Sequence, residues 1–312
     1  MSPNRTRVKE AIENGHSPSP GASSGVLGLL IWWGAFLAKI TPSALRDLAT
    51  KHGLDLGLLP PAPNAAQAFK RAAHSVESQS EGIRIELVFR DPMEITYGLL
   101  RRSTDKGSRR AKWTQFARVS WFPKSRGQQF LSDNPNDPTV QAIVDAIPHF
   151  HDHYVTDDIA RLNLNVMKRC NAIPMTITRT NSRFVPAPSS ATALALAEVL
   201  AEVPGADIAV ITVPDDPISR GTMVHATRSR LSSKVEEAET ELERIKIALD
   251  AAAEGKGNGP RDSTLQSRVE DYKQLSAKIE MFGDLLRFKA EDLEKRLADV
   301  RASLLGLLGF DE

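Results

Sequence analysis

The sequence has little cysteine, little net charge and no long apolar segment. Its one cysteine, Cys170, excludes a disulfide framework within the chain and zinc sites built from several thiolates. A single thiol also fits a reducing compartment, so we expect a cytoplasmic protein. The formal net charge of +1 gives the whole molecule no electrostatic preference for nucleic acid or an anionic membrane. Any preference of that kind must be local.

Hydrophobic runs in this chain are short. The most apolar run, VLGLLIWWGAFLA, occupies residues 26–38 and is shorter than the about 20 residues that a membrane-spanning helix requires. The sequence therefore predicts no transmembrane segment. Two tryptophans in this turn-bounded run favour a buried strand or helix instead.

The first two thirds of the chain predict a flexible leader followed by an α+β body. Residues 1–25 are polar and rich in serine, proline and glycine, which is typical of a flexible segment. Residues 26–215 have the mixed pattern of the body. Three strand candidates follow one another with short, turn-like connections, which favours an antiparallel meander. They are residues 83–90, 94–102 and 111–122.

Helices are expected on either side of these strands. Thr41 is a suitable N-cap, Pro42 suits the first helical position and Gly53 suits the stop of a first helix. A proline-rich connector then leads into a second short helix. The predicted fold class is therefore α+β, with a largely antiparallel sheet and flanking helices. The other expected elements are helices over 138–151, from Thr156 and over 189–203, a hairpin turning at Asn181-Ser182, and a strand over 206–213.

Two short motifs give the chain a family resemblance. They are LLPPAPNAAQAFKRA, residues 58–72, and RFVP, residues 183–186, and a long helical C-terminal part follows them. With these features the chain resembles an uncharacterised bacterial and phage-associated family known only as a domain of unknown function. The resemblance implies that the chain is one recurring unit, and it implies no activity.

The C-terminal part, residues 216–312, has a different pattern. Apolar residues recur in steps of four and three over 231–252 and again over 265–307, a heptad spacing that keeps one stripe facing a partner helix. The segment 254–263, with three glycines and a proline, interrupts this stripe, which we call the seam. The residues of the seam are Leu231, Val235, Leu242, Ile245, Leu249, Leu265, Val269, Ile279, Leu286, Leu293, Leu297, Val300 and Leu304.

The seam predicts a long α-helical coiled-coil hairpin of two helices, roughly 45 and 63 Å long at about 1.5 Å per residue. The hairpin can close within one chain or between chains. The end of the sequence, ASLLGLLGFDE, is apolar and needs a cover, but it has no Lys or Arg for a membrane surface. The sequence therefore predicts a homo-oligomer, or a protein partner bound through the coiled coil.

Residues 101–126, which we call the basic hairpin, are the main candidate for binding an anion. This stretch has nine Lys or Arg residues against one acid, with Trp113, Phe116, Trp121 and Phe122 interleaved. Cations for phosphates and rings for stacking suit single-stranded nucleic acid. An anionic protein partner, or an ordinary half-buried sheet with rings inside and cations in water, explains the pattern as well. The candidate nucleic-acid contacts are Arg101, Arg102, Lys106, Arg109, Arg110, Lys112, Lys124 and Arg126.

Patterns typical of catalysis or metal binding are weak. His149, His151 and His153 alternate at a helix end, which predicts a solvated junction between helices. A metal site and a pH-responsive interface are the alternatives for these histidines. Cys170 is expected to be a buried thiol, although the two cations before it would lower the pKa of an exposed one. We expect no catalytic residues, no metal and no cofactor.

These observations favour a non-enzymatic structural or interaction protein. We expect it to self-assemble or to dock a partner through its C-terminal coiled coil. A nucleic-acid-binding protein that uses the basic hairpin is the alternative hypothesis. An enzyme is the least favoured class, because the sequence shows no catalytic motif.

Overall fold

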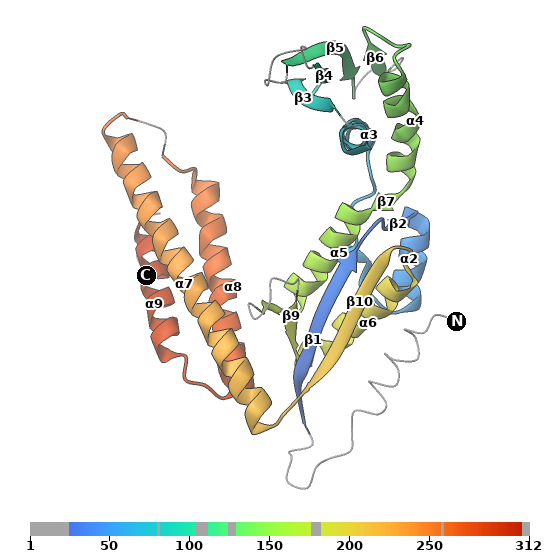
Figure 1. The fold of residues 1–312 in the computed structure, drawn as a ribbon. Helices are drawn as coiled ribbons and strands as arrows, with labels where there is room; N and C mark the ends of the chain where they lie inside the picture. The colour runs from blue at the N-terminus through green and yellow to red at the C-terminus, as the bar shows by residue number, and fades with distance from the viewer. Residues whose placement is uncertain are drawn as a thin grey trace. The chain divides into compact units, whose positions relative to one another are not determined.

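The computed structural model describes residues 25–79, 82–103, 112–123, 129–175, 182–256 and 259–307. Residues 1–24, which belong to the predicted leader, lie outside the described residues. The chain is α+β, as the sequence predicted, with antiparallel sheets and a long C-terminal helical region (Figure 1). It divides into two compact units. The first contains the chain up to Gly34, Leu164–Ala201 and the chain from Asp207 onward, and the second contains Ala35–Asn163 and Glu202–Ala206.

A four-stranded sheet of order β10-β1-β9-β8 belongs to the first unit. The apolar run becomes β1 (Val26–Ala35), because its alternate residues Leu27, Leu29 and Ile31 are buried on one face. β1 pairs antiparallel with β9 (Arg183–Pro186), and β9 pairs antiparallel with β8 (Ile173–Pro174). The end of β10 (Ala206–Pro214) lies beside the start of β1, since the Asp215 amide donates to the Gly25 carbonyl at 2.9 Å.

Two helices follow the predicted pattern, one before and one after the β8–β9 pair in the sequence. α5 (Thr156–Arg169) begins at the predicted residue, with acids in its first turn and bases in its last turn, as the helix dipole favours. After the short 3-10 helix η2 (Ala187–Ser189), α6 (Ser190–Glu202) buries several small and apolar residues. The hairpin predicted at Asn181-Ser182 lies partly outside the described residues, which do not include 176–181, and on either side of that gap β8 and β9 pair antiparallel.

The predicted meander is confirmed in the second unit. β3 (Ile83–Arg90), β4 (Ile95–Ser103), β5 (Lys112–Trp121) and β6 (Phe130–Ser132) form one antiparallel sheet in that order. α3 (Ala65–Gln79) and α4 (Pro138–Asp152) pack together and share a hydrophobic core with this sheet (Figure 1). The buried ring of Phe69 on α3 lies 5.6 Å from that of Tyr97 and 5.8 Å from that of Trp121.

Local signals also set the first helix of this unit. α2 (Pro42–Lys51) begins after Thr41, whose hydroxyl oxygen accepts the Ala44 amide at 3.2 Å, and it ends before Gly53 at φ +69°. A short 3-10 helix, η1 (Leu56–Leu58), then leads into the proline-rich connector. The two-residue strands β2 (Lys39–Ile40) and β7 (Tyr154–Val155) pair antiparallel beside it.

The C-terminal region contains three helices rather than the two of the predicted hairpin. They are α7 (Pro217–Ala253), α8 (Asp262–Leu286) and α9 (Glu291–Leu307), which we together call the arm. The second predicted helix is broken because Arg287 adopts a left-handed conformation at φ +56°. The amide of Phe288 then donates to the Gly283 carbonyl at 3.1 Å, a common way to end a helix. Among the described residues, no helix combines the length and apolar character that crossing a membrane requires.

Candidate functional site

The seam is covered by the arm itself. Its two stretches lie on α7, α8 and α9, and these three helices contact one another pairwise. All seam residues are buried except Leu249, which is partly buried against the same hydrophobic cluster. The seam therefore closes within one chain, and the hydrophobic stripe that suggested a contact between chains is occupied. The buried members are Leu231, Val235, Leu242, Ile245, Leu265, Val269, Ile279, Leu286, Leu293, Leu297, Val300 and Leu304.

Ion pairs join the helices of the arm outside the seam. Arg296 on α9 makes two contacts with Glu239 on α7, at 2.8 and 2.6 Å, and its hydrogen bond lowers the pKa of that carboxyl. Arg268 on α8 lies 3.3 Å from Glu241 on α7. Exposed pairs of this kind contribute little to stability, so the buried seam holds the arm together and the ion pairs favour one register.

The arm is anchored on the sheet of the first unit by specific contacts. The ring of Phe282 on α8 lies 6.2 Å from that of Phe184 on β9, and both are fully buried. One turn earlier on α8, the ammonium of Lys278 donates to the carbonyl of Ala172 at 3.0 Å. At the start of α7, the Arg220 guanidinium pairs with Asp215 and donates to the Leu285 carbonyl at 2.9 Å. The sheet therefore binds the arm through α8 and the first turns of α7.

The basic hairpin is only partly described. Lys106, Arg109, Arg110, Lys124 and Arg126 lie outside the described residues, so their role as nucleic-acid contacts stays a prediction. Arg102 and Lys112 are exposed where β4 and β5 pair.

Arg101, another predicted contact, is already engaged. Its guanidinium lies 3.3 Å from the Asp137 carboxylate and 4.2 Å above the ring of Phe116. Phe116 sits at an irregularity of β5 and packs against the core, and Trp121 is buried. Trp113, at 37% exposure, is the more accessible ring. The sheet thus buries Trp121, partly buries Phe116 and leaves Trp113 exposed, which agrees only in part with the half-buried sheet that was one of the alternatives.

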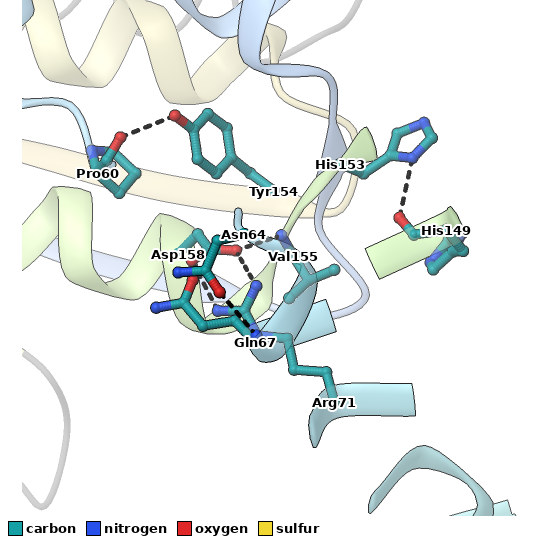
Figure 2. A network of polar contacts seen from close by, with 9 residues as sticks. All are labelled: Pro60, Asn64, Gln67, Arg71, His149, His153, Tyr154, Val155 and Asp158. Carbon is teal, nitrogen blue, oxygen red and sulfur yellow. Dashed lines mark hydrogen bonds and ion pairs between the residues drawn. The ribbon is translucent and has the colours of Figure 1, made fainter. Parts of the chain in front are cut away.

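The three histidines occupy the predicted junction at the end of α4, and Figure 2 shows His149 and His153. The rings of His149 and His153 stack at 5.4 Å, and the His153 ring nitrogen Nδ1 lies 3.1 Å from the His149 carbonyl oxygen. His151 is exposed and lies 2.9 Å from Asp152. Within the described part of the chain, no group of three His, Cys, Asp or Glu side chains is arranged to hold a metal ion.

The network beside this junction was not predicted from the sequence (Figure 2). The Arg71 guanidinium on α3 donates two hydrogen bonds to the Asp158 carboxylate on α5, both at 2.7 Å. Asp158 is almost fully buried and also accepts the Val155 amide at 3.0 Å. Nearby, the Tyr154 hydroxyl donates to the Pro60 carbonyl at 2.7 Å. These contacts fix the proline-rich connector and α3 to the start of α5, so Asp158, an acid in the first turn of that helix, is a tertiary clamp.

Cys170 is buried, as predicted. Burial raises the pKa of its thiol to about 11, and the opposing effect of Arg169 is smaller. The thiol lies 3.7 Å from the Ser189 carbonyl. A thiol with a raised pKa carries little thiolate at neutral pH, which is unfavourable for a nucleophile.

His149 predicts a pH dependence of stability. Burial, followed by the charges of Lys39 and His153, lowers the pKa of His149 below 6.5. The unfolded chain therefore binds a proton at higher pH than the folded chain, and stability should fall as the pH drops below about 6.5. We expect His149→Gln to flatten this decline in urea unfolding curves at pH 7.5, 6.5 and 5.5. His151→Gln, at an exposed position, is the matched control, and equal curves for the two variants would contradict the prediction.

The fold defines an α+β protein with a C-terminal helical arm whose three helices bury their apolar seam against one another. The chain belongs to a family of unknown function, DUF6744, whose pattern covers residues 26–309. No curated protein and no solved structure matches the chain.

Proposed function

We propose that the protein is a non-enzymatic interaction protein that docks a protein partner on the outer surface of its arm. The observation that carries this proposal is the closure of the seam within one chain. Because the seam is covered, it forms the interior of a preformed scaffold and offers a partner no free apolar surface. The binding surface of such an arm is its outside, which is fixed in shape before the partner arrives.

The length of the arm supports docking. α7 has 37 residues, which corresponds to about 55 Å at about 1.5 Å per residue. β1, with ten residues, spans only about 33 Å at about 3.3 Å per residue. A helix that served only to cover this sheet would not need that length, so the far part of the arm is available for another molecule.

Self-assembly through the seam is the less favoured form of the proposal. It would require the helices of one arm to separate and exchange with those of another, with the buried seam leucines exposed on the way. We therefore expect light scattering of the full chain to give the mass of one chain. A stable dimer or larger particle would contradict the docking proposal and support assembly between chains.

The cellular setting is part of this proposal. A single cysteine that is buried and free fits a reducing cytoplasm. The resemblance of the two sequence motifs to a bacterial and phage-associated family supports a partner from a bacterium or its phage.

The docking surface can be tested with paired variants of the full chain. On α7, Arg244 and Ile247 lie three residues apart, with the Arg244 side chain 75% exposed and Ile247 61% exposed. We expect Arg244→Glu together with Ile247→Glu to weaken binding of a partner purified from the source cells at least tenfold, without lowering the stability of the chain. Leu131→Glu, at an exposed position on β6 in the other unit, is the control.

Two measurements decide the outcome of that comparison. Calorimetry with the repurified partner should separate the arm variant from the control, and hydrogen exchange should slow on α7, α8 or α9 when the partner is added. A partner that binds all three chains equally, with no protection on the arm, would overturn the proposal.

A further inference from the structure

Four basic side chains meet where the arm contacts the β8–β9 edge of the sheet. Arg183 is the first residue of β9 and pairs with Pro174 on β8. Lys278 on α8 donates to the Ala172 carbonyl, which directly precedes β8. Arg230 and Lys234 are one turn apart on α7, and α7 contacts β8. These are contacts inside the first unit.

The cluster has few carboxylates to balance it. Within the described residues, Arg183, Arg230 and Lys278 form no ion pair with an acid, whereas Lys234 pairs with Glu237. The charge of Arg230 also contributes to lowering the pKa of that glutamate, after Lys234 itself. Among the described residues, Glu237 is thus the acid that pairs with a member of the cluster.

Two nitrogen atoms in the cluster are buried without a partner. The Nε atoms of Arg183 and Arg230 are inaccessible and make no hydrogen bond. A buried donor without an acceptor costs free energy, more so when it is charged.

The electrostatic effect of the cluster is strongest at Lys278. Burial, and then the charges of Arg183, Arg230 and Lys234, lowers the pKa of its ammonium to about 8. Burial and the charge of Arg230 also lower the pKa of Arg183. Cations held together in this way repel one another, and a bound anion would remove the repulsion.

We propose that Arg183, Arg230, Lys234 and Lys278 form a binding site for a phosphate group. Guanidinium groups donate pairs of hydrogen bonds that fit the oxygens of a phosphate, and an ammonium adds a point charge. The ring of Trp33 lies 5.8 Å from the Arg183 guanidinium carbon, which puts an aromatic side chain at the same place. The phosphate belongs either to a free small anion or to a nucleic-acid strand, whose bases can stack on such a ring. The site lies where the arm contacts β8 and β9 and does not include Arg244 or Ile247, so it goes beyond the proposed docking function.

The test compares the full chain with Arg230→Gln. This variant removes one cation and no described hydrogen bond of Arg230, so the fold should keep its stability or gain some. We expect inorganic phosphate to raise the melting temperature and change the tryptophan fluorescence of the full chain, with the apparent affinity about tenfold weaker in the variant, as for one lost charge-assisted hydrogen bond. Arg244→Gln, at an exposed position of the arm, is the control and should behave like the full chain. Sodium chloride at equal ionic strength separates phosphate binding from a general salt effect.

A single-stranded oligonucleotide distinguishes the two sources of phosphate. If the ligand is a nucleic acid, the oligonucleotide should bind more tightly than inorganic phosphate, and the slope of log affinity against log salt should fall by about 0.7 in Arg230→Gln. Binding of inorganic phosphate without tighter oligonucleotide binding assigns the site to a small anion. No response to either ligand, or the same response in Arg230→Gln and Arg244→Gln, overturns the proposal.

Discussion

Replacing Asp158 with alanine should lower the free energy of unfolding by about 3–5 kcal/mol, the usual cost of leaving one partner of a buried ion pair alone. The side chain of Asp158 is 5% exposed and that of Arg71 is 19% exposed, so water cannot replace the lost carboxylate fully. The Val155 amide loses its acceptor in the same step. Urea unfolding followed by circular dichroism measures the effect.

Two further variants make this prediction specific. Asp157→Ala removes the neighbouring acid, which is exposed in the first turn of the same helix, and should cost no more than about 1 kcal/mol, the size of a helix-dipole effect. The double change of Arg71→Met with Asp158→Leu should cost less than Asp158→Ala alone, because no charge is left without a partner. Equal losses for Asp157→Ala and Asp158→Ala would show that the clamp contributes nothing.

Leu297→Ala should have an effect of similar size on the arm. Leu297 is 1% exposed and belongs to the hydrophobic cluster that α7, α8 and α9 share. Truncating a buried leucine costs about 2–5 kcal/mol, through lost burial and the cavity that remains. The loss should appear as faster hydrogen exchange in the three helices, with α9 exchanging first, since it is the shortest of them.

The control for this variant is an exposed apolar residue of the same arm. Ile247 is 61% exposed, and Ile247→Ala should change stability by no more than about 0.5 kcal/mol. Because the seam closes within one chain, the stability of Leu297→Ala should also be independent of protein concentration. A midpoint that shifts with concentration would mean that the leucine lies between chains, contrary to the contacts described above.

Local signals predicted the parts of the fold that depend on neighbouring residues. The cap at Thr41 and the stop at Gly53 were recognised because their chemistry acts within one turn. Alternation predicted β3, β4 and β5, and short connections made their antiparallel pairing the natural choice. The division into a body over 26–215 and a coiled coil from 216 stays a prediction.

The break between α8 and α9 could not be predicted in the same way. The heptad spacing continues through the break, because Leu286, Ala290 and Leu293 follow one another in steps of four and three. All three side chains are buried. The left-handed residue at the break is Arg287 rather than a glycine, so the usual marker of a helix end is missing. Spacing of apolar residues defines which side of a helix is buried, but it does not state how many helices share the core.

The candidate sites depend on contacts that are distant in the sequence. Arg71 and Asp158 are 87 residues apart, and Lys278 and Ala172 are 106 residues apart. Arg71 lies in the LLPPAPNAAQAFKRA motif, but that motif does not contain Asp158, and Lys278 and Ala172 belong to no motif, so composition and spacing carried no signal for either contact. The basic hairpin was found because its cations lie within one stretch of the sequence, 101–126, whereas the cluster around Lys278 is assembled from three separate elements.

The helix break at Arg287 has a consequence for synthesis of the protein. α9 leaves the ribosome after α7 and α8, yet it completes the cover of both helices. At about 5–20 residues per second, the stretch from Leu286 to Leu307 takes roughly 1–4 seconds to synthesise, and during this time the leucines of the earlier two helices are uncovered. During this time the nascent chain is a substrate for chaperones that bind exposed hydrophobic surfaces. A chain truncated before Glu291 would keep the leucines of α7 and α8 exposed permanently.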